Sequence, residues 1–185
     1  REASRMTAMV EDLFQLSRAT SGTLQLTLEP LALAEVASDA VAAELHPDVA
    51  VVAEAPETWP TVLGSDTDLT RVLRNVLANA VRHTPQGGTV RLSAGTRGGK
   101  AWLHVDDGCG GISEDDLPFL FDVGYRGSGA RTPSEHTGAG LGLSIARGLM
   151  AAQGGGISLV NHGAGCRVEI TLAVAARAAR VAAGP

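Results

Sequence analysis

The sequence lacks long apolar runs, an excess of basic residues and a cysteine framework. No apolar stretch approaches the roughly 20 residues that a membrane-spanning helix needs. With 15 basic against 20 acidic residues, and arginines spread along the chain, nothing supports a nucleic-acid-binding surface, so we predict no nucleic-acid partner. Cys109 and Cys166 are the two cysteines. We see no secretion signal, so we expect a reducing compartment and no disulfide framework.

The length and composition predict one folded domain with a short appendage. A chain of 185 residues with 44% hydrophobic content and mixed charge is large enough to bury a core. The first residues, from Arg1, already follow a helical pattern, and no initiator methionine precedes them. We therefore interpret the sequence as a piece of a longer protein.

Hydrophobic periodicity and turn residues predict alternating helices and short strands. A run of apolar residues at i, i+3 and i+4 marks the longest helix, which begins after a cap at Ser65 or Asp66 and ends near His83, before Pro85. The predicted helices are 1–18, 31–45, 66–83, 114–121 and 141–153, and the predicted strands are 24–28, 49–53, 61–63, 90–94, 100–105, 157–160 and 166–174. Residues 122–137 have no periodicity and are rich in small residues, which suggests a functional flap or disorder.

Two asparagines lie one turn apart on the longest predicted helix. Asn75 and Asn79 are at positions i and i+4, so they share a face beside the apolar stripe. A neutral amide oxygen suits Mg²⁺, which keeps several waters and takes further oxygens from phosphates. Two solvated helix amides would give the same pattern, and from this helix alone the two interpretations have similar weight.

An acidic, glycine-rich turn follows the predicted strand 100–105. Asp106 and Asp107 precede Gly108, Gly110 and Gly111. A carboxylate here can accept a hydrogen bond from an exocyclic amine such as that of adenine, while glycines let the backbone approach a flat base. An ordinary Asp-Gly turn is the alternative, and it is common.

A second glycine cluster opens the predicted helix 141–153. Gly138, Gly140 and Gly142 would expose backbone amides at a helix N-terminus, where an anion is favoured. The cluster lacks the preceding strand and the spacing of a dinucleotide-binding turn. Arg126, which follows Tyr125 in the flap, is a cation that could close on phosphates; a solvated loop arginine is the simpler interpretation of that residue alone.

Taken together, these motifs resemble the ATP-binding catalytic domain of bacterial sensor histidine kinases. That domain belongs to the superfamily shared with DNA gyrase, the heat-shock chaperone and the mismatch-repair ATPase. NVLANAVRHTP resembles the N box of the family, FLFDVGYRG its F box and GAGLGL its second glycine box. The resemblance covers roughly 29–174, and residues 1–22 resemble the second helix of the family's dimerisation hairpin.

The resemblance implies a fold and a domain organisation. It implies an α+β, two-layer sandwich with a mixed, mostly antiparallel sheet, helices on one face, and ATP between the helices and a flexible lid. Residues 1–22 would end the dimerisation hairpin, 23–175 would form the catalytic domain and 176–185 a flexible tail. It also implies a cytoplasmic domain of a sensor anchored in the inner or plasma membrane.

The resemblance assigns roles to matching residues. Asn79 would ligate Mg²⁺ with support from Asn75, and both would be catalytic together with Arg126, which would reach phosphate from the lid, residues 122–137. The residues expected to contact the nucleotide are Asn75, Asn79, Arg82, His83, Asp107, Cys109, Gly111, Ile112, Tyr125, Arg126, Gly138, Ala139, Gly140, Leu141, Gly142 and Leu143. Within this set Asp107 would bind the adenine amine, and the glycines of the second box would act as hinges of the lid.

The first glycine box departs from the family pattern, which is Asp-x-Gly-x-Gly. Counted back from Ile112, the aspartate is Asp107 and Cys109 replaces the first glycine. The alternative frame begins at Asp106 and keeps both glycines, but it shifts the strand by one residue and reverses which side chains face inward. We favour Asp107, with Cys109 as a small residue close to the nucleotide.

Three functions remain open from the sequence. The first is a histidine kinase that transfers the γ-phosphate of ATP to a histidine of its dimerisation domain, for relay to a response regulator. The second is a hydrolysing ATPase, against which Asn75 counts, because water-splitting relatives have a glutamate there. The third is a regulatory nucleotide-binding module. None of the five histidines lies in a His-Glu-x-x-Thr-Pro context, so we expect no phosphoacceptor in this chain. The full-length protein would be a homodimer and this piece mostly a monomer.

Overall fold

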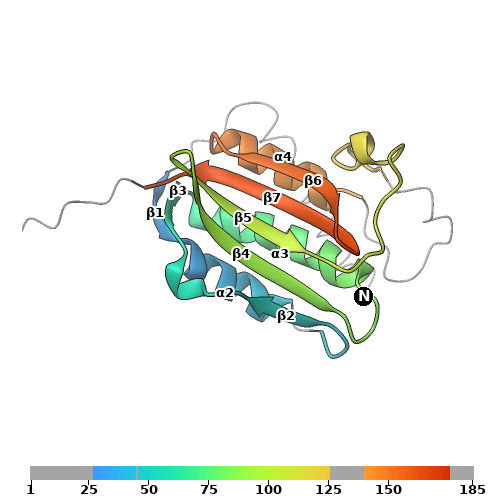
Figure 1. Ribbon diagram of the computed structural model, residues 1–185. Helices are drawn as coiled ribbons and strands as arrows, with labels where there is room; N and C mark the ends of the chain where they lie inside the picture. Colours follow the sequence, from blue (N-terminus) through green and yellow to red (C-terminus); the bar gives the residue numbers. More distant parts are fainter. Residues whose placement is uncertain (1–26, 45, 126–139, 176–185) are drawn as a thin grey trace, which may run out of the picture.

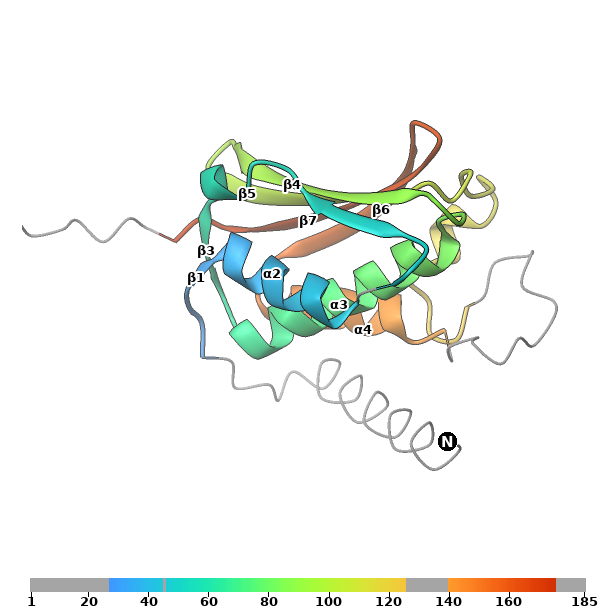
Figure 2. The ribbon, with the colours of Figure 1, turned by 90° about the horizontal axis from the view of Figure 1, so that it is seen from below.

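The computed structural model describes residues 27–44, 46–125 and 140–175. These residues form two layers, a five-stranded sheet and a layer of helices against one of its faces (Figures 1 and 2). In chain order the elements are β1 (Glu29–Ala32), α2 (Leu33–Ala43), β2 (Ala50–Ala53), η1 (Pro56–Thr58), β3 (Thr61–Gly64), α3 (Asp66–His83), β4 (Thr89–Arg97), β5 (Lys100–Asp106), η2 (Leu117–Phe119), α4 (Gly142–Ala152), β6 (Gly156–His162) and β7 (Gly165–Ala173).

The sheet is mixed and mostly antiparallel, which confirms the predicted fold class. Its strand order is β2-β4-β5-β7-β6. Only β2 and β4 are parallel within this sheet, and the other neighbours are antiparallel. The short strands β1 and β3 form a separate antiparallel pair. Figure 2 shows α2, α3 and α4 side by side on the same face of the sheet.

The core lies between the sheet and the helices. Alternate residues of the central strand β5 belong to the hydrophobic core, namely Ala101, Leu103 and Val105, as period-two alternation requires. Leu73 and Leu77 of α3 are fully buried below them. Because truncation of such a leucine leaves a cavity, replacing either by alanine is expected to cost about 2–5 kcal/mol. This core holds α3 against β5, so the loop that leaves β5 lies over the end of α3.

Helix α3 begins and ends where local chemistry requires. Ser65 is the N-cap, and its side chain accepts a hydrogen bond from the Asp68 amide. Asp66 and Asp68 lie in the first turn, while Arg82 and His83 lie in the last, which complements the helix dipole at both ends. Pro85 disfavours helical geometry at the preceding residue, so the helix ends at His83.

Three predicted elements were wrong in extent or type. The strand expected at 24–28 is found at Glu29–Ala32 instead; residues 27 and 28 are not in a strand, and 24–26 lie outside the described residues. The helix expected from residue 31 begins at Leu33, because Leu31 and Ala32 pair with β3. The helix expected over 114–121 is one 3₁₀ turn, Leu117–Phe119, with Pro118 inside it, where a proline prevents a longer helix.

The predictions for residues 1–22 and 176–185 fall outside the part of the chain that the structure describes. Among the described residues, no helix combines the length and apolar character that crossing a membrane requires.

Candidate functional site

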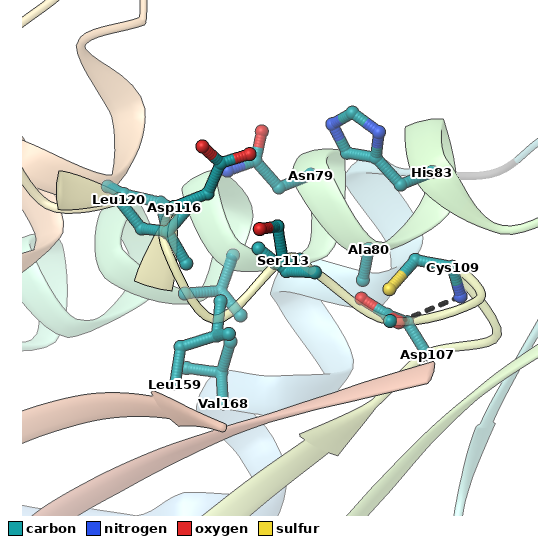
Figure 3. Close-up of a pocket in the computed structure, with 14 residues that line it drawn as sticks. Asn79, Ala80, His83, Asp107, Cys109, Ser113, Asp116, Leu120, Leu159 and Val168 are labelled. Atoms are coloured by element: carbon teal, nitrogen blue, oxygen red, sulfur yellow. Dashed lines mark hydrogen bonds between the residues drawn. The ribbon is translucent and has the colours of Figure 1, made fainter. Parts of the chain in front are cut away.

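A cavity of about 360 Å³ opens between α3 and the loop that follows β5. Figure 3 shows Asn79, Ala80 and His83 on α3, facing Asp107, Cys109 and Ser113 of the loop, with Leu159 and Val168 on the sheet side. The volume is within the range of small-molecule sites, roughly 300–1,000 Å³. The complete lining is Val76, Asn79, Ala80, His83, Asp107, Cys109, Gly111, Ile112, Ser113, Asp116, Leu120, Leu143, Leu159 and Val168. It combines apolar walls with a few polar groups.

Asp107 lines this cavity, whereas Asp106 does not. Asp106 is the last residue of β5 and makes a bidentate ion pair with Arg167 of β7, at 2.6 and 2.8 Å. Since the residues of β5 that belong to the hydrophobic core have odd numbers, Asp106 lies on the sheet face away from the helices. Asp107 follows the strand, and its Oδ1 accepts hydrogen bonds from the amides of Cys109 and Cys166, both at 3.0 Å. The geometry therefore supports the frame that begins at Asp107.

The last turn of α3 forms the wall opposite this loop. Asn79 and His83 both line the cavity, and Arg82 donates a long hydrogen bond to the Asn79 Oδ1, at 3.4 Å. Partial burial lowers the pKa of His83 and the Arg82 charge lowers it further, while Asp107 acts in the opposite direction. The net effect lowers the pKa of His83 and so favours the neutral imidazole.

Asn75 lies one turn earlier on α3 and does not line the cavity. Its Nδ2 is buried and has no hydrogen-bond partner among the described residues. Its side chain faces Gly142 at the start of α4, where an added Cβ would lie 3.8 Å from the Asn75 Cγ. A buried amide without a partner is costly, so Asn75 marks a polar position beside the second glycine cluster.

The loop after β5 accommodates Cys109 without backbone strain. Gly110 and Gly111 have positive φ values of +83° and +90°, which glycine adopts readily. Cys109 is not among the described residues with positive φ, so a side chain is tolerated there. Asn161 of β6 fixes the end of the loop, because it accepts from the Ile112 amide and donates to the Ile112 carbonyl, both at 2.8 Å.

Gly124, near the start of the expected lid, and Gly140, three residues after its end, lie close together. The Gly124 amide donates to the Gly140 carbonyl at 3.1 Å, and Gly140 has a φ of +72°. Tyr125 donates its hydroxyl to Asp116 at 2.7 Å, and this bond raises the pKa of the tyrosine. Arg126, together with the rest of the expected lid up to residue 137, lies outside the described residues.

The predicted site residues fall into three groups. Those that line the cavity are Asn79, His83, Asp107, Cys109, Gly111, Ile112 and Leu143. Those described but not lining it are Asn75, Arg82, Tyr125, Gly140, Leu141 and Gly142. Arg126, Gly138 and Ala139 lie outside the described residues.

Several residues that shape the site were missed from the sequence. Thr84 is buried, donates to the Ala80 carbonyl and accepts from the Gly108 amide, so it joins the end of α3 to the loop. Its place before Pro85 was a signal, because the residue before a proline is disfavoured in a helix and a threonine hydroxyl there can bond a carbonyl of the last turn. Asn161, a polar residue just before a glycine turn, was a weaker signal. Nothing in the sequence marked Ser113, or Asp116 within the predicted helix 114–121, as a residue of the site.

Comparisons with known proteins identify the family of this fold and site. Residues 64–176 match the family model described as histidine kinase-, DNA gyrase B-, and HSP90-like ATPase. The chain belongs to this family.

The curated relatives include bacterial sensor kinases. The signal transduction histidine-protein kinase BaeS of Escherichia coli is 33% identical over 159 residues, covering 84% of this chain and 34% of BaeS. The sensor protein SphS of Synechococcus elongatus is 35% identical over 186 residues, covering 91% of this chain and 44% of SphS. The chain thus spans less than half the length of these relatives.

Among solved structures, full-length ShkA in complex with AMPPNP matches with a TM-score of 0.76 and 26% identity, over 96% of this chain and 38% of ShkA. The mycobacterial sensor histidine kinase MprB matches with a TM-score of 0.67 and 25% identity, over 78% of this chain and 97% of that structure. The resemblance to histidine kinase catalytic domains that the sequence motifs indicated is confirmed.

Proposed function

We propose that this chain binds ATP and is the catalytic domain of a sensor histidine kinase. The observation that carries the proposal is the placement of Asp107 and Asn79 in one cavity of nucleotide size, on the loop after β5 and on α3 respectively. The membership of the family and the named sensor kinases among its relatives support the same function.

Asp107 forms the adenine end of the proposed site. Its Oδ1 is held by two backbone amides, which fix the carboxylate in the wall of the cavity. The other carboxylate oxygen, Oδ2, can accept a hydrogen bond from the exocyclic amine of adenine. Leu159, Val168 and Ile112 supply apolar surface for the base, while the φ of Gly111 lets the backbone pass close to it.

Asn79 and Asn75 fit the phosphate end. The Asn79 side chain reaches the cavity, and Asn75 holds a buried amide without a partner in the described part of the chain. Neutral amide oxygens suit Mg²⁺ that phosphates already neutralise, so we assign Asn79 as the ligand and Asn75 as its support. When bound, Mg²⁺ would supply charge neutralisation for the phosphates.

The remaining assigned residues surround the phosphates and ribose. His83 would hydrogen-bond there, and Arg82 would add positive charge. Tyr125 and Arg126 would approach from the lid, and the glycine cluster from Gly138 to Gly142, with Leu141 and Leu143, would present amides at the start of α4. Phosphoryl transfer depends mainly on such positioning and charge neutralisation.

We infer transfer to a protein side chain rather than hydrolysis. Asn75 is one turn before Asn79, and an amide is no general base for water. The acceptor would be a histidine of the dimerisation domain, which would hand the phosphoryl group to a response regulator. The full-length protein would act as a homodimer, with this domain in the cytoplasm and its anchor in the membrane.

Substitution of the two neighbouring aspartates tests the nucleotide site. We expect Asp107→Asn to weaken binding of a non-hydrolysable ATP analogue by about tenfold or more, because one hydrogen bond to a charged group contributes about 1.5–3 kcal/mol. Asp106→Asn, the matched control, is expected to leave nucleotide affinity within about threefold, because Asp106 does not line the cavity and an asparagine there can still accept a hydrogen bond from Arg167. Calorimetric titration measures both, and the reverse ranking would favour the other frame.

The fate of the γ-phosphate distinguishes a kinase from an ATPase. With the full-length protein and γ-labelled ATP, we expect acid-labile, base-stable label on the protein and little free phosphate. Rapid release of inorganic phosphate, without label on the protein, would support the hydrolysing alternative.

A further inference from the structure

The two cysteines of the chain meet in the wall of the cavity. Cys109 lies in the loop after β5, is half-buried and lines the cavity. Cys166 lies in β7 and is 1% exposed. Their sulfur atoms are 2.9 Å apart although 57 positions separate them in sequence, and both are free thiols. Figure 3 shows the Cys109 sulfur close to the Asp107 carboxylate.

Asp107 fixes the two cysteines relative to one another. Its Oδ1 accepts from the backbone amides of both Cys109 and Cys166, and its own amide donates to the Cys166 carbonyl at 2.9 Å. The Gly110 amide donates to the Ala164 carbonyl at 3.0 Å. The backbones around both thiols are therefore tied together, and the sulfur contact is part of the folded framework.

The geometry favours a covalent bond between the sulfurs over a shared metal ion. A disulfide has a sulfur–sulfur length near 2.05 Å, so the atoms need to approach by about 0.9 Å. Asp107, Cys109 and Cys166 could together offer ligands to a metal. Two thiolates on one tetrahedral Zn²⁺, each about 2.3 Å from it, would lie about 3.8 Å apart. The Asp107 Oδ1 also already accepts two hydrogen bonds.

We propose that Cys109 and Cys166 are a redox modification site, which a peroxide converts to an intramolecular disulfide in the wall of the cavity. Because Cys109 lines the cavity and Cys166 is buried, Cys109 reacts first. Its thiolate attacks one peroxide oxygen, and the O–O bond breaks with release of hydroxide. Cys109 is then a sulfenic acid. The Cys166 sulfur then attacks that sulfur, and the S–O bond breaks. The departing hydroxide takes the thiol proton, so two thiols and one hydrogen peroxide give a disulfide and two waters.

Oxidation of the two cysteines and nucleotide binding are expected to oppose each other. This coupling rests on the proposed function, because it requires a nucleotide in the cavity. A nucleotide bound beside Asp107 covers Cys109. The Cys166 thiol donates a hydrogen bond to the Asn161 Oδ1 at 3.7 Å. A disulfide has no thiol proton, so Asn161, which also bonds the backbone of Ile112, loses this donor. Since the disulfide changes the wall that the nucleotide contacts, oxidation is expected to lower nucleotide affinity, by about fivefold or more for a coupling in the usual range.

Burial sets the conditions for the reaction. It raises the pKa of both thiols, and the nearby Asp107 carboxylate raises each further. Since the thiolate is the reacting form, the assay is run at about pH 8, where more of it is present than at neutrality.

The test is oxidation of the folded chain by hydrogen peroxide, followed by thiol titration and peptide mass spectrometry without reductant. We expect both thiols to disappear together, a Cys109–Cys166 peptide to appear, and a dithiol reductant to reverse the change. Cys166→Ser is expected to stop at a sulfenic acid on Cys109, which a carbon nucleophile traps. Disulfide-linked dimers, or oxidation of the two cysteines independently, would overturn the proposal, as would binding of Zn²⁺ at both thiols in preference to oxidation.

A parallel titration separates this inference from the proposed function. An ATP analogue is expected to slow thiol loss severalfold, and the oxidised chain to bind the analogue at least about fivefold more weakly than the reduced chain. If the disulfide forms but the reduced chain binds no nucleotide, the proposed function fails while the modification site stands. If the reduced and oxidised chains bind the nucleotide equally, the coupling is refuted while the proposed function stands.

Discussion

Asn79 is the residue on which the assigned metal chemistry depends. Its side chain lines the cavity in the last turns of α3, and Arg82 is its hydrogen-bond partner among the described residues. We expect Asn79→Ala to abolish the part of nucleotide binding that depends on Mg²⁺, because the amide oxygen assigned as a ligand is removed. Calorimetry with and without Mg²⁺ measures this difference directly.

Arg74→Ala is the control for that substitution. Arg74 lies on the same helix, is exposed and does not line the cavity, so the variant is expected to keep the Mg²⁺ dependence. Wild-type, Mg²⁺-enhanced affinity in Asn79→Ala would refute the ligand assignment.

The contacts of Glu169, on the outer face of the sheet, lead us to expect that the unfolding free energy depends on pH. His104 donates to it at 2.7 Å and Arg97 pairs with it at 3.1 Å, and these contacts lower its pKa below the ordinary value of 4.5. A carboxyl group whose pKa is lower in the folded state than in the unfolded state stabilises the fold at pH values above its unfolded-state pKa. This stabilisation is lost as the pH falls through the folded-state pKa. The difference in unfolding free energy between wild type and Glu169→Gln is therefore expected to be largest near pH 7 and to shrink in acid.

Urea unfolding at several pH values between neutrality and strong acid tests this expectation. Glu57→Gln, at an exposed position in η1, is the control and is expected to show a small difference at every pH. A difference for Glu169→Gln that stays constant through the acid range would contradict the account.

At the residue scale, the sequence predicted the kinds of groups in the site better than their arrangement. It identified both Asp106 and Asp107 and favoured Asp107 by counting back from Ile112, but it gave no structural reason for the choice, which depends on which face of β5 each aspartate occupies. The ion pair with Arg167 engages Asp106, and Arg167 is 61 residues away in sequence. Partners that distant leave no local pattern to read.

The loop after β5 passes very close to Gly165, the first residue of β7. A Cβ at Gly165 would clash with the Asp107 carbonyl, whereas one at Gly108 would meet Thr84 only at 3.8 Å, an ordinary contact. We expect Gly165→Ala to destabilise the chain by about 1–3 kcal/mol, as overpacking does, and to weaken nucleotide binding by displacing Asp107.

Gly108→Ala is the matched variant, because Gly108 also adjoins Asp107 and its φ is not among the positive values. It is expected to change stability by less than about 1 kcal/mol. Equal unfolding free energies for the two variants, measured by denaturant titration, would show that the loop is not held as tightly as the contacts indicate.

Gln153 joins the end of α4 to the start of α3. Its Oε1 accepts from the Ser65 amide at 2.8 Å, its Nε2 donates to the Leu149 carbonyl, and the residue is buried. Gln153→Met keeps much of the volume but leaves the Ser65 amide without this partner, so we expect a loss of about 1–3 kcal/mol.

Gln86→Met is the control for Gln153→Met. Gln86 is exposed and donates to Asp48 at the surface, so the change is expected to stay within about 0.5 kcal/mol. A thermal or urea midpoint for Gln153→Met as high as that of Gln86→Met would argue against the link between the two helices.

At the element scale, long periodic segments were predicted well and short ones were not. The α3 pattern gave both ends of the helix, because its caps and Pro85 act locally. Strand β1 was misplaced, since its residues are extended by pairing with β3 rather than by their own preference. The single turn η2 was overestimated as a helix, because apolar residues at helical spacing outweighed Pro118 in the prediction.

At the scale of the whole molecule, the topology places distant motifs around one cavity. The β5-β7-β6 order brings the loop after β5 beside the turn between β6 and β7. Helices α3 and α4 pack together on the same sheet face, so Asn75 faces Gly142. The fold class followed from the resemblance to a known family, which the motifs carry by their order and spacing in the sequence. The cavity could not be derived from it, because its lining comes from α3, the loop after β5, α4, β6 and β7.

The central claim is that this cavity binds ATP with Mg²⁺, and calorimetric titration with a non-hydrolysable ATP analogue tests it most directly. The account predicts saturable binding by the reduced chain, tightened by Mg²⁺, and weaker binding when Asp107 is replaced by asparagine. Absence of binding up to millimolar analogue, or binding that is indifferent to both Mg²⁺ and Asp107→Asn, would contradict it.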